Sequence, residues 1–384
     1  MNKQHYLFLK HCIKIFNSVL TGIVRRLKTN VFTFFFITSV CIPSCSEEEK
    51  KPAFVAEPED STENKSYTAY FGVNLAGGEF GKTPGTYNVD YTYPTMQELD
   101  YFKSKGLKLI RLPFKWERIQ PTLGEALNAT ELNRLVAVVD SANSRGLFIV
   151  LDMHNYGRRK VEGSNQIIGT PAVKIEDIKY AWREIANTFK SKTNIWGYGI
   201  MNEPHDMLTS PTWFTIAQEI IAGIRARDTT TPIIVGGDSW SSAERWVQSS
   251  DSLKYLSDPE KKIVFEAHVY FDDDASGTYN DTYDNEKANA NTGITRVTPF
   301  VNWLKSNNLK GFIGEYGVPG NDSRWLIVLD NFLAFLKSNC INGTYWAAGP
   351  WWGNYPLSVE PKNGVDQPQM SVLKYHVGLE SNCP

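Results

Sequence analysis

The stretch that decides how this chain folds is Tyr198-Gly199-Ile200-Met201-Asn202-Glu203-Pro204-His205. Its apolar run is short and bounded, which is typical of a buried strand rather than a helix. Pro204 cannot donate a hydrogen bond to a neighbouring strand, and it disfavours helical backbone angles at the residue before it. The strand is therefore expected to end here, with Asn202 and Glu203 at its carboxyl end.

A second stretch repeats this pattern: Gly311-Phe312-Ile313-Gly314-Glu315-Tyr316-Gly317. Again an apolar run ends in a glutamate, which here is Glu315. Two carboxyl groups at two strand ends are what the cleavage of a glycosidic bond requires. Either glutamate alone is equally well explained as a salt-bridged strand end, so the interpretation depends on the rest of the chain.

Strand-like and helix-like segments alternate from about residue 70 onward. Besides the stretch at 198–203, strands are predicted at residues 71–75, 107–112, 147–152, 232–236, 263–270, 311–317 and 343–347. Helices are predicted at residues 94–105, 130–145, 175–190, 211–226, 241–255, 297–307, 325–338 and 369–376. Such alternation implies parallel strands joined by crossover helices, and apolar runs fit strands that are buried on both faces. The count of eight predicts an α/β fold, a closed (β/α)8 TIM barrel that forms a single catalytic domain.

The amino-acid composition limits the classes of protein to which this chain can belong. At 384 residues with 42% hydrophobic content, the chain can bury a sizeable core. A formal net charge of −2 does not suggest nucleic acid as a partner, or a membrane except through an anchor. Eleven Trp and eighteen Tyr supply aromatic surface that serves either as core or as stacking faces for sugar rings. No glycine-rich phosphate fingerprint follows the first predicted strand, which argues against a nucleotide-binding sheet.

The first 45 residues have the pattern of a signal peptide. A basic stretch at 25–28 precedes an apolar run at 31–40, which is too short for a comfortable membrane span. The run leads into Ile42-Pro43-Ser44-Cys45, which resembles a bacterial lipobox with Cys45 as the lipidated residue. Residues 46–66 read as a flexible polar linker, and 67–384 as the catalytic domain. We expect an exported outer-membrane or cell-surface lipoprotein; the alternative is a secreted protein cleaved nearby.

Two further cysteines, Cys340 and Cys383, would remain in the mature chain. An even pair in an exported protein is a candidate disulfide bond. Two free, buried thiols are the alternative.

Polar and aromatic residues gather at the expected strand ends. They are Asn74, Arg111, His154, Asn202 with Glu203, Trp240, His268 with Tyr270, Glu315 and Trp346. A buried arginine is costly without an anion, so Arg111 is expected to pair with Glu315 and keep that carboxyl ionised. Without a cation assigned to it, Glu203 is expected to have a raised pKa and to act as a proton donor.

This ordered set resembles glycoside hydrolase family 5, also called cellulase family A. The likeness is greatest to the endo-β-1,4-glucanases of subfamily 5, and it covers about residues 70–361. The stretches that carry it are Phe71-Gly72-Val73-Asn74-Leu75-Ala76-Gly77, His154-Asn155-Tyr156, Ile200-Met201-Asn202-Glu203-Pro204-His205-Asp206, Ser276-Gly277-Thr278 and Trp346-Ala347-Ala348-Gly349.

The resemblance implies a retaining endo-β-1,4-glucanase that cleaves cellulose or soluble β-glucan by double displacement. Glu203 would be the general acid/base and Glu315 the nucleophile. The substrate-binding residues implied are Arg111, His154, Asn202, His268, Tyr270 and Trp346, with Tyr156 and Trp240 as weaker candidates for flanking sugar subsites.

Alternatives remain open at this point. The same chemistry could act on mannan, xyloglucan or mixed-linkage glucan, or a degenerate barrel could bind glycans at the cell surface without hydrolysis. His154, His268 and Asp152 invite a metal interpretation, but no His-x-His or His-Glu-x-x-His spacing occurs, so no metal and no cofactor are expected. We expect a monomer whose partner is a β-glucan polysaccharide or oligosaccharide.

Overall fold

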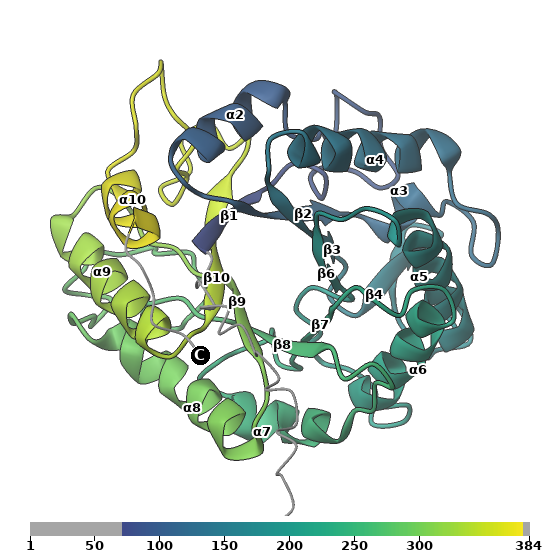
Figure 1. Ribbon diagram of the computed structural model, residues 1–384. Helices are drawn as coiled ribbons and strands as arrows, with labels where there is room; N and C mark the ends of the chain where they lie inside the picture. Colours follow the sequence, from purple (N-terminus) through teal and green to yellow (C-terminus); the bar gives the residue numbers. More distant parts are fainter. Residues whose placement is uncertain (1–70, 379–384) are drawn as a thin grey trace, which may run out of the picture. The chain divides into compact units, whose positions relative to one another are not determined.

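Eight parallel strands close into a barrel in the computed structural model of the protein, which describes residues 71–378 (Figure 1). In order around the barrel the strands are β1 (Phe71–Leu75), β10 (Asn342–Ala348), β9 (Gly311–Glu315), β8 (Ile263–His268), β7 (Ile233–Gly236), β6 (Ile195–Gly199), β3 (Phe148–Met153) and β2 (Leu109–Phe114). Neighbours in this order pair in parallel, and β2 closes the ring against β1. The predicted (β/α)8 fold is confirmed.

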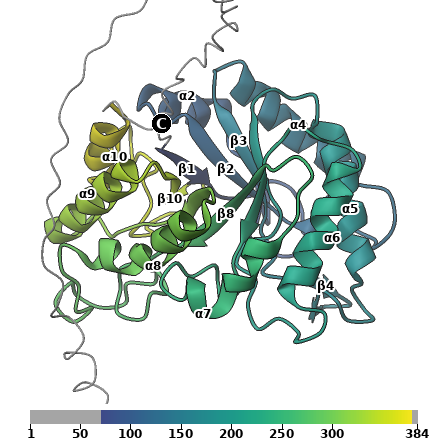
Figure 2. The same ribbon diagram turned by 60° about the horizontal axis from the view of Figure 1, so that its bottom comes forward.

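Helices surround the strands as an outer layer (Figures 1 and 2). The main ones are α2 (Met96–Ser104), α4 (Ala129–Asn143), α5 (Ile175–Phe189), α6 (Trp213–Arg225), α7 (Trp246–Ser250), α8 (Thr292–Asn307), α9 (Ser323–Ser338) and α10 (Gln369–Gly378). Local sequence explains where they begin. In α2, for example, Thr95 accepts a hydrogen bond from the backbone N–H of Glu98, whose carboxylate accepts one from the N–H of Thr95.

One helix is shorter than predicted, and a few short elements were not predicted. The helix expected at 241–255 begins only at Trp246 and continues as the 3₁₀ helix η1 (Asp251–Tyr255). The backbone before it is left-handed at Ser239, Trp240 and Ser241, with φ of 57°, 58° and 52°, so a right-handed helix cannot start there. The hairpin of β4 (Arg158–Val161) and β5 (Ser164–Ile167), and the short helix α3 (Trp116–Ile119), lack the apolar periodicity on which prediction depends.

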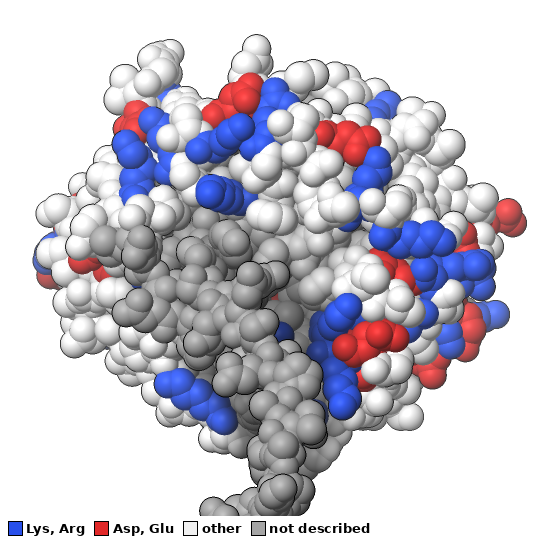
Figure 3. Space-filling view, viewed as in Figure 1, with Lys and Arg blue, Asp and Glu red and all other residues white. Residues whose placement is uncertain are grey.

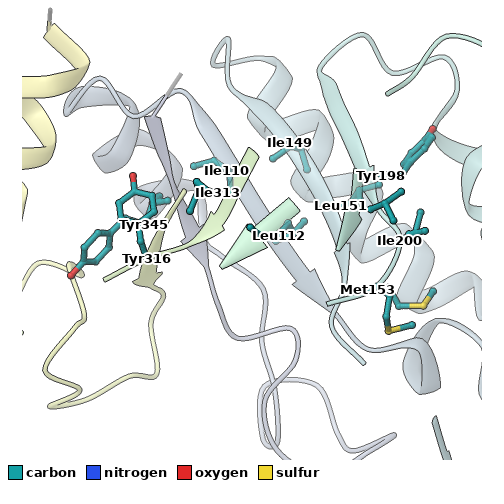
Figure 4. Packing of buried hydrophobic residues seen from close by; sticks show 14 of the residues in the cluster. Ile110, Leu112, Ile149, Leu151, Met153, Tyr198, Ile200, Ile313, Tyr316 and Tyr345 are labelled. Atoms are coloured by element: carbon teal, nitrogen blue, oxygen red, sulfur yellow. The ribbon is translucent and has the colours of Figure 1, made fainter. Parts of the chain in front are cut away.

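Successive side chains along each strand point to opposite faces, so the core has two layers. Side chains such as Ile110, Ile149 and Leu151 face the helices and belong to one large apolar cluster, part of which Figure 4 shows. The alternate positions face the barrel interior, where Leu109, Val150, Ile234, Val264 and Phe312 form a separate, smaller cluster. Two residues further along β2, β3 and β8 the interior positions become charged, at Arg111, Asp152 and Glu266. The interior of the barrel therefore changes from apolar to ionic toward the carboxyl ends of its strands.

Several expectations concern residues outside the described range. By its internal contacts the chain divides into units at 1–62 and 63–384, and the described residues belong to the second unit. The signal segment 1–45 with Cys45, the linker 46–66 and Cys383 lie outside the described residues, so those assignments stay predictions. Cys340 is disulfide-bonded, and its pairing with Cys383 stays a prediction.

The surface of the described residues mixes both signs of charge. On the face shown in Figure 3, Lys and Arg side chains are interspersed with Asp and Glu. Exposed ion pairs such as Arg145 with Asp100 at 2.8 Å and Lys192 with Asp140 at 2.6 Å reflect this mixing. Within residues 71–378 no helix is both long and apolar enough to cross a membrane.

Candidate active site

The candidate site is built around Arg111, whose side chain is completely buried inside the barrel. Its guanidinium forms ion pairs with carboxylates on three other strands: Asp152 at 3.1 Å, Glu266 at 2.9 Å and Glu315 at 3.1 Å. Burial by itself would lower the pKa of this guanidinium, but the three carboxylates outweigh burial and raise it. Arg111 is therefore a fixed cation that joins β2, β3, β8 and β9.

Arg111 also orients the amide of Asn202. Its Nη2 donates a hydrogen bond to Asn202 Oδ1 at 2.7 Å, while Asn202 Nδ2 lies 3.2 Å from Nε2 of His154. Because the amide oxygen faces the arginine, the amide N–H groups face His154 and the mouth of the barrel. Asn74 supports the same guanidinium through its Oδ1 at 3.0 Å, and its own amide donates to the backbone oxygen of Gly314 at 2.8 Å.

The ring of His154 is fixed by its neighbours. Burial lowers its pKa well below the ordinary value, and the charges of Lys115 and Arg111 lower it further, so the ring is neutral. Its Nδ1 lies 2.7 Å from Asp152 Oδ2 and therefore carries the proton, which leaves Nε2 to accept from Asn202. Arg111, Asp152, His154 and Asn202 thus form a closed ring of contacts.

Glu203 lies in a turn after β6, with its carboxylate held toward β8. Its φ of 41° is in the left-handed region, which is uncommon for a residue other than glycine and recurs at functional sites. Hydrogen bonds fix the turn on both sides: the N–H of Asn202 donates to the oxygen of Met153 at 2.9 Å, and that of Trp240 to Pro204 at 3.1 Å. As a result Glu203 Oε1 lies 2.7 Å from Nδ1 of His268.

His268 is surrounded by carboxylates. Its Nδ1 faces Glu203 at 2.7 Å and Glu315 at 3.6 Å, and its Nε2 faces Glu266 at 3.1 Å. Burial disfavours the charged ring, but Glu315, Glu203 and Glu266 together raise the pKa of His268 to about 10. Despite burial, Arg111 and His268 lower the pKa of Glu266, so that carboxyl is ionised.

Glu315 ends β9 and faces Glu203 across the site. Its Oε1 pairs with Arg111, and the hydroxyl of Tyr270 donates to its Oε2 at 2.8 Å. One carboxylate oxygen of Glu315 and one of Glu203 lie within 4.8 Å of each other. Burial raises the pKa of Glu315 to about 7, with a contribution from the negative charge of Glu203, against the opposing effects of His268, Arg111 and Tyr270.

The structure corrects the electrostatics expected from the sequence. The contact between Arg111 and Glu315 is present, but it does not keep the pKa of Glu315 low. The reasons are burial and the division of one guanidinium charge among three carboxylates. The cation beside Glu203 is the protonated ring of His268 rather than an arginine.

Aromatic residues form one wall of the site. Trp346, on β10, stacks on His154 with ring centres 5.6 Å apart and planes 14° from parallel. The hydroxyl of Tyr156 lies 3.1 Å from Nε2 of His154. Trp352 packs edge-on against Trp346 at 5.7 Å. Trp346 and Tyr156 therefore both contact His154, whose Nε2 lies 3.2 Å from the Asn202 amide.

A cavity of about 260 Å³ opens beside Glu203. Trp240 is 43% exposed at its edge and stacks on His205, with ring centres 4.3 Å apart. Ser276, part of a stretch that carries the family resemblance, also lines this wall. The sequence did not indicate the wall's other polar residues, which include Ser242, Glu244, Arg245, Asp274 and Arg296. Most of them come from loops, whose side chains follow no strand periodicity, and Arg296 lies on α8.

The sequence did not predict that two buried carboxylates inside the site, Asp152 and Glu266, pair with Arg111. Asp152 and Glu266 each stand two residues before a predicted site histidine, His154 and His268. Residues two apart on a strand face the same side, so Asp-x-His and Glu-x-His on inward-facing positions were a usable signal.

Glu203, His268 and Glu315 lie close enough together to be considered as metal ligands. A ligating histidine must offer a ring lone pair. Both ring nitrogens of His268 face carboxylates, and its pKa of about 10 keeps the ring protonated near neutral pH. The donor set therefore disfavours a metal ion.

Comparison with known proteins decides the family. The model of the family described as "Cellulase (glycosyl hydrolase family 5)" matches residues 63–351. The chain belongs to glycosyl hydrolase family 5. Its resemblance to that family is thereby confirmed, and the protein is a glycoside hydrolase.

Relatives within family 5 cover most of the chain. "Probable endo-beta-1,4-glucanase B" of Neosartorya fischeri is 37% identical over 304 residues, which are 77% of this chain and 87% of that protein. The structure of Pseudomonas stutzeri endoglucanase Cel5A in complex with cellobiose is 38% identical with a TM-score of 0.76, covering 82% of this chain and 95% of that one. The endo-beta-1,4-glucanase Xac0029 of Xanthomonas axonopodis pv. citri is 35% identical with a TM-score of 0.74, covering 80% and 98%.

The raised pKa of Glu315 predicts a pH-dependent effect of Glu315→Gln on stability. A carboxyl with a pKa near 7 in the folded state and 4.5 in the unfolded state binds more protons when folded, so its contribution to stability falls as pH rises from about 4.5 to 7. Across this window, the free energy of unfolding of Glu315→Gln should rise relative to wild type by roughly 3 kcal/mol. Urea unfolding at several pH values measures this.

Glu176→Gln is the control, because Glu176 is exposed on α5. Its difference from wild type should stay within about 0.5 kcal/mol at every pH. A difference for Glu315→Gln that does not vary with pH would contradict the raised pKa.

Proposed function

We propose that the protein is a retaining endo-β-1,4-glucanase that cleaves internal bonds of cellulose or soluble β-glucan. The observation that carries this proposal is the approach of Glu203 and Glu315 to within 4.8 Å. Retaining glycosidases have carboxyls about 5–5.5 Å apart, whereas inverting ones need about 6.5–9.5 Å to admit a water. The short separation supports attack by a carboxylate rather than by water.

In this proposal Glu315 is the nucleophile and Glu203 the general acid/base. Two carboxyls this close share a proton more easily than they both ionise. Arg111 and the Tyr270 hydroxyl stabilise negative charge on Glu315, as a nucleophile requires. Glu203 is also the carboxyl that lines the open cavity, where a departing sugar has room.

The double displacement follows from these positions. In the first step Glu315 forms a bond to the anomeric carbon while the glycosidic bond breaks and the leaving oxygen takes the proton of Glu203. In the second step a water gives a proton to Glu203 and attacks the same carbon, which releases Glu315. Asn202, oriented by Arg111 and His154, would donate to the sugar 2-hydroxyl, a contact that strengthens in the transition state.

The aromatic residues support a chain of sugars on both sides of the bond. Trp346, held flat against His154, would stack on the sugar that is attacked, with Tyr156 beside it. Trp240, whose indole is held by His205, would contact the sugars on the leaving-group side. The names of the relatives, endo-β-1,4-glucanases, and the cellobiose bound by the Pseudomonas stutzeri enzyme support a β-1,4-glucan as substrate.

Azide rescue should separate the two glutamates. Glu203→Ala should lower kcat/KM on cellulose by about 10²–10⁴-fold, because it removes general acid catalysis. With an aryl β-cellobioside, added azide should restore its turnover and give β-cellobiosyl azide, because azide attacks the glycosyl-enzyme that Glu315 still forms. Glu315→Ala with azide should give the α-azide, because azide then replaces the nucleophile. Product NMR distinguishes the two anomers.

Glu176→Ala is the matched control and should show wild-type turnover without azide. An α-azide from Glu203→Ala, or full activity in Glu315→Ala, would overturn the assignment of roles.

A substrate panel should identify the polymer. Carboxymethyl cellulose and lichenan, which contain β-1,4-glucosidic bonds, should release reducing ends fastest, and mannan, xylan and xyloglucan more slowly. The released reducing ends are compared at equal substrate mass, with Glu315→Gln as the blank. Mannan or xyloglucan as the best substrate would keep the chemistry and change the specificity. No release from any polymer would favour a non-hydrolytic glycan-binding protein.

We also propose that the enzyme is exported and anchored at the outer membrane or cell surface through Cys45. Residues 46–66 would serve as a flexible linker, and the enzyme would act as a monomer. The lipobox-like segment before Cys45 supports the anchor. In a bacterial host, the full chain should incorporate labelled fatty acid and fractionate with membranes, whereas Cys45→Ala should not. The variant should keep wild-type kcat on soluble substrate. Equal labelling of both would contradict lipidation at Cys45.

A further inference from the structure

Glu266 is a buried carboxylate to which the proposed reaction gives no role. Its side chain is 2% exposed, and its Oε1 contacts two cationic groups, Nε of Arg111 at 2.9 Å and Nε2 of His268 at 3.1 Å. The opposite ring nitrogen of His268, Nδ1, lies 2.7 Å from Glu203. Arg111, Glu266, His268 and Glu203 therefore form one continuous chain of contacts that ends on the proposed acid/base.

Space around this chain is held open by a glycine on the neighbouring strand. A Cβ at Gly314 would lie 1.9 Å from Oε1 of Glu266 and 2.8 Å from Nε2 of His268. Any larger residue there would displace the contact between the two side chains. The strand that carries Glu315 thus leaves room for the pairing of Glu266 with His268 directly beside the nucleophile.

We propose that Glu266 is a positioning residue that keeps a proton available to the proton donor, Glu203. Glu266 accepts the Nε2–H of His268 and so turns Nδ1 toward Glu203. One proton is thereby retained in the hydrogen bond between Glu203 and His268. This inference rests on the proposed role of Glu203. In the first step the retained proton moves from Nδ1 of His268 to Glu203 as Glu203 protonates the leaving oxygen, and a proton from the water of the second step returns by the same route.

The surroundings of His268 show why Glu266 is needed. From β9 and the end of β6, Glu315 and Glu203 favour a protonated ring, and the Tyr270 hydroxyl is bonded to Glu315. Burial opposes the protonated ring. The positive charge of Arg111 on β2 also disfavours a protonated ring, unless carboxylates neutralise that charge. Asp152 and the neutral His154, on and after β3, are further titratable groups of this layer, and Lys115 and Tyr156 contact His154. Glu315 contacts Arg111 and the ring through separate oxygens, at 3.1 and 3.6 Å, whereas a single oxygen of Glu266 contacts both, at 2.9 and 3.1 Å. Glu266 therefore neutralises the arginine while it binds the ring.

Nitrogen NMR of the full chain with ¹⁵N-labelled histidine tests the proposal directly. The chain has six histidines, and the signal of His268 is assigned by its loss in His268→Gln. In wild type the ring should keep its Nε2–H and lose its other N–H proton with a midpoint near pH 10, because the carboxylates raise the pKa of His268 to about 10. In Glu266→Gln, which keeps the shape and removes the charge, the midpoint should fall by about one pH unit or more.

The pH profile of kcat/KM on an unactivated oligosaccharide is the functional readout. Its alkaline limb should shift to lower pH by about one unit or more in Glu266→Gln and return toward wild type in Glu266→Asp, which restores the charge. A purely structural role would lower the whole profile without moving the limb. Asp330→Asn is the matched control, because Asp330 pairs at 2.8 Å with another buried histidine, His376, on α10. It should leave the alkaline limb unchanged.

The outcomes separate this inference from the proposed function. If His268 of the wild type titrates near its ordinary pKa, or with the same midpoint in Glu266→Gln, the role of Glu266 is overturned whatever the azide products show. A second outcome is that the NMR midpoint shifts in Glu266→Gln while azide rescue assigns the acid/base role to another residue. In that case Glu266 does set the protonation of the His268 ring, but Glu203 is not the proton donor and the proposed function fails. If Glu266→Gln does not fold, the wild-type titration and Glu266→Asp still decide.

Discussion

The structure depends on burying one guanidinium, that of Arg111, at the centre of the barrel. An unpaired buried charge costs several kcal/mol, and removing one partner of a buried pair typically costs about 3–5 kcal/mol. Here carboxylates from β3, β8 and β9 approach the guanidinium together, and Asn74 and Asn202 accept its remaining hydrogen bonds. The barrel must close in the correct register for all of these groups to reach one side chain. The requirement that stabilises the fold is therefore also the one that assembles the site.

The same electrostatics gives two similar carboxyls different surroundings. Glu315 receives Arg111 and the Tyr270 hydroxyl, whereas Glu203 receives His268 and borders the open cavity. One oxygen from each lies within 4.8 Å, so a charge on either raises the cost of a charge on the other. Arg111 supports one glutamate directly and influences the other through Glu266 and His268. A single buried cation thus contributes to both halves of the proposed acid–nucleophile pair.

Prediction from sequence succeeded where chemistry follows local pattern. Eight apolar runs ending in polar residues were enough to predict the barrel, and the period of two along each strand was available to find Asp152 and Glu266. Prediction failed where a residue's environment comes from several strands at once. From sequence Arg111 had one expected partner, and three carboxylates meet it in the fold. Cavity-wall residues such as Ser242 and Glu244 lie on a loop whose course depends on left-handed backbone at residues such as Trp240, and sequence periodicity does not predict that backbone.

By itself, the sequence determined the order of strands and helices, the family resemblance, and the two glutamates that end apolar strands. These are properties of single segments, set by periodicity, by proline and by residue type. Only the tertiary structure decided the ionisation of the site. The raised pKa of Glu315, the neutral ring of His154 and the protonated ring of His268 arise from burial combined with charges more than a hundred residues away in some cases. A pKa depends on distance and desolvation in space, and neither can be read from positions along a chain.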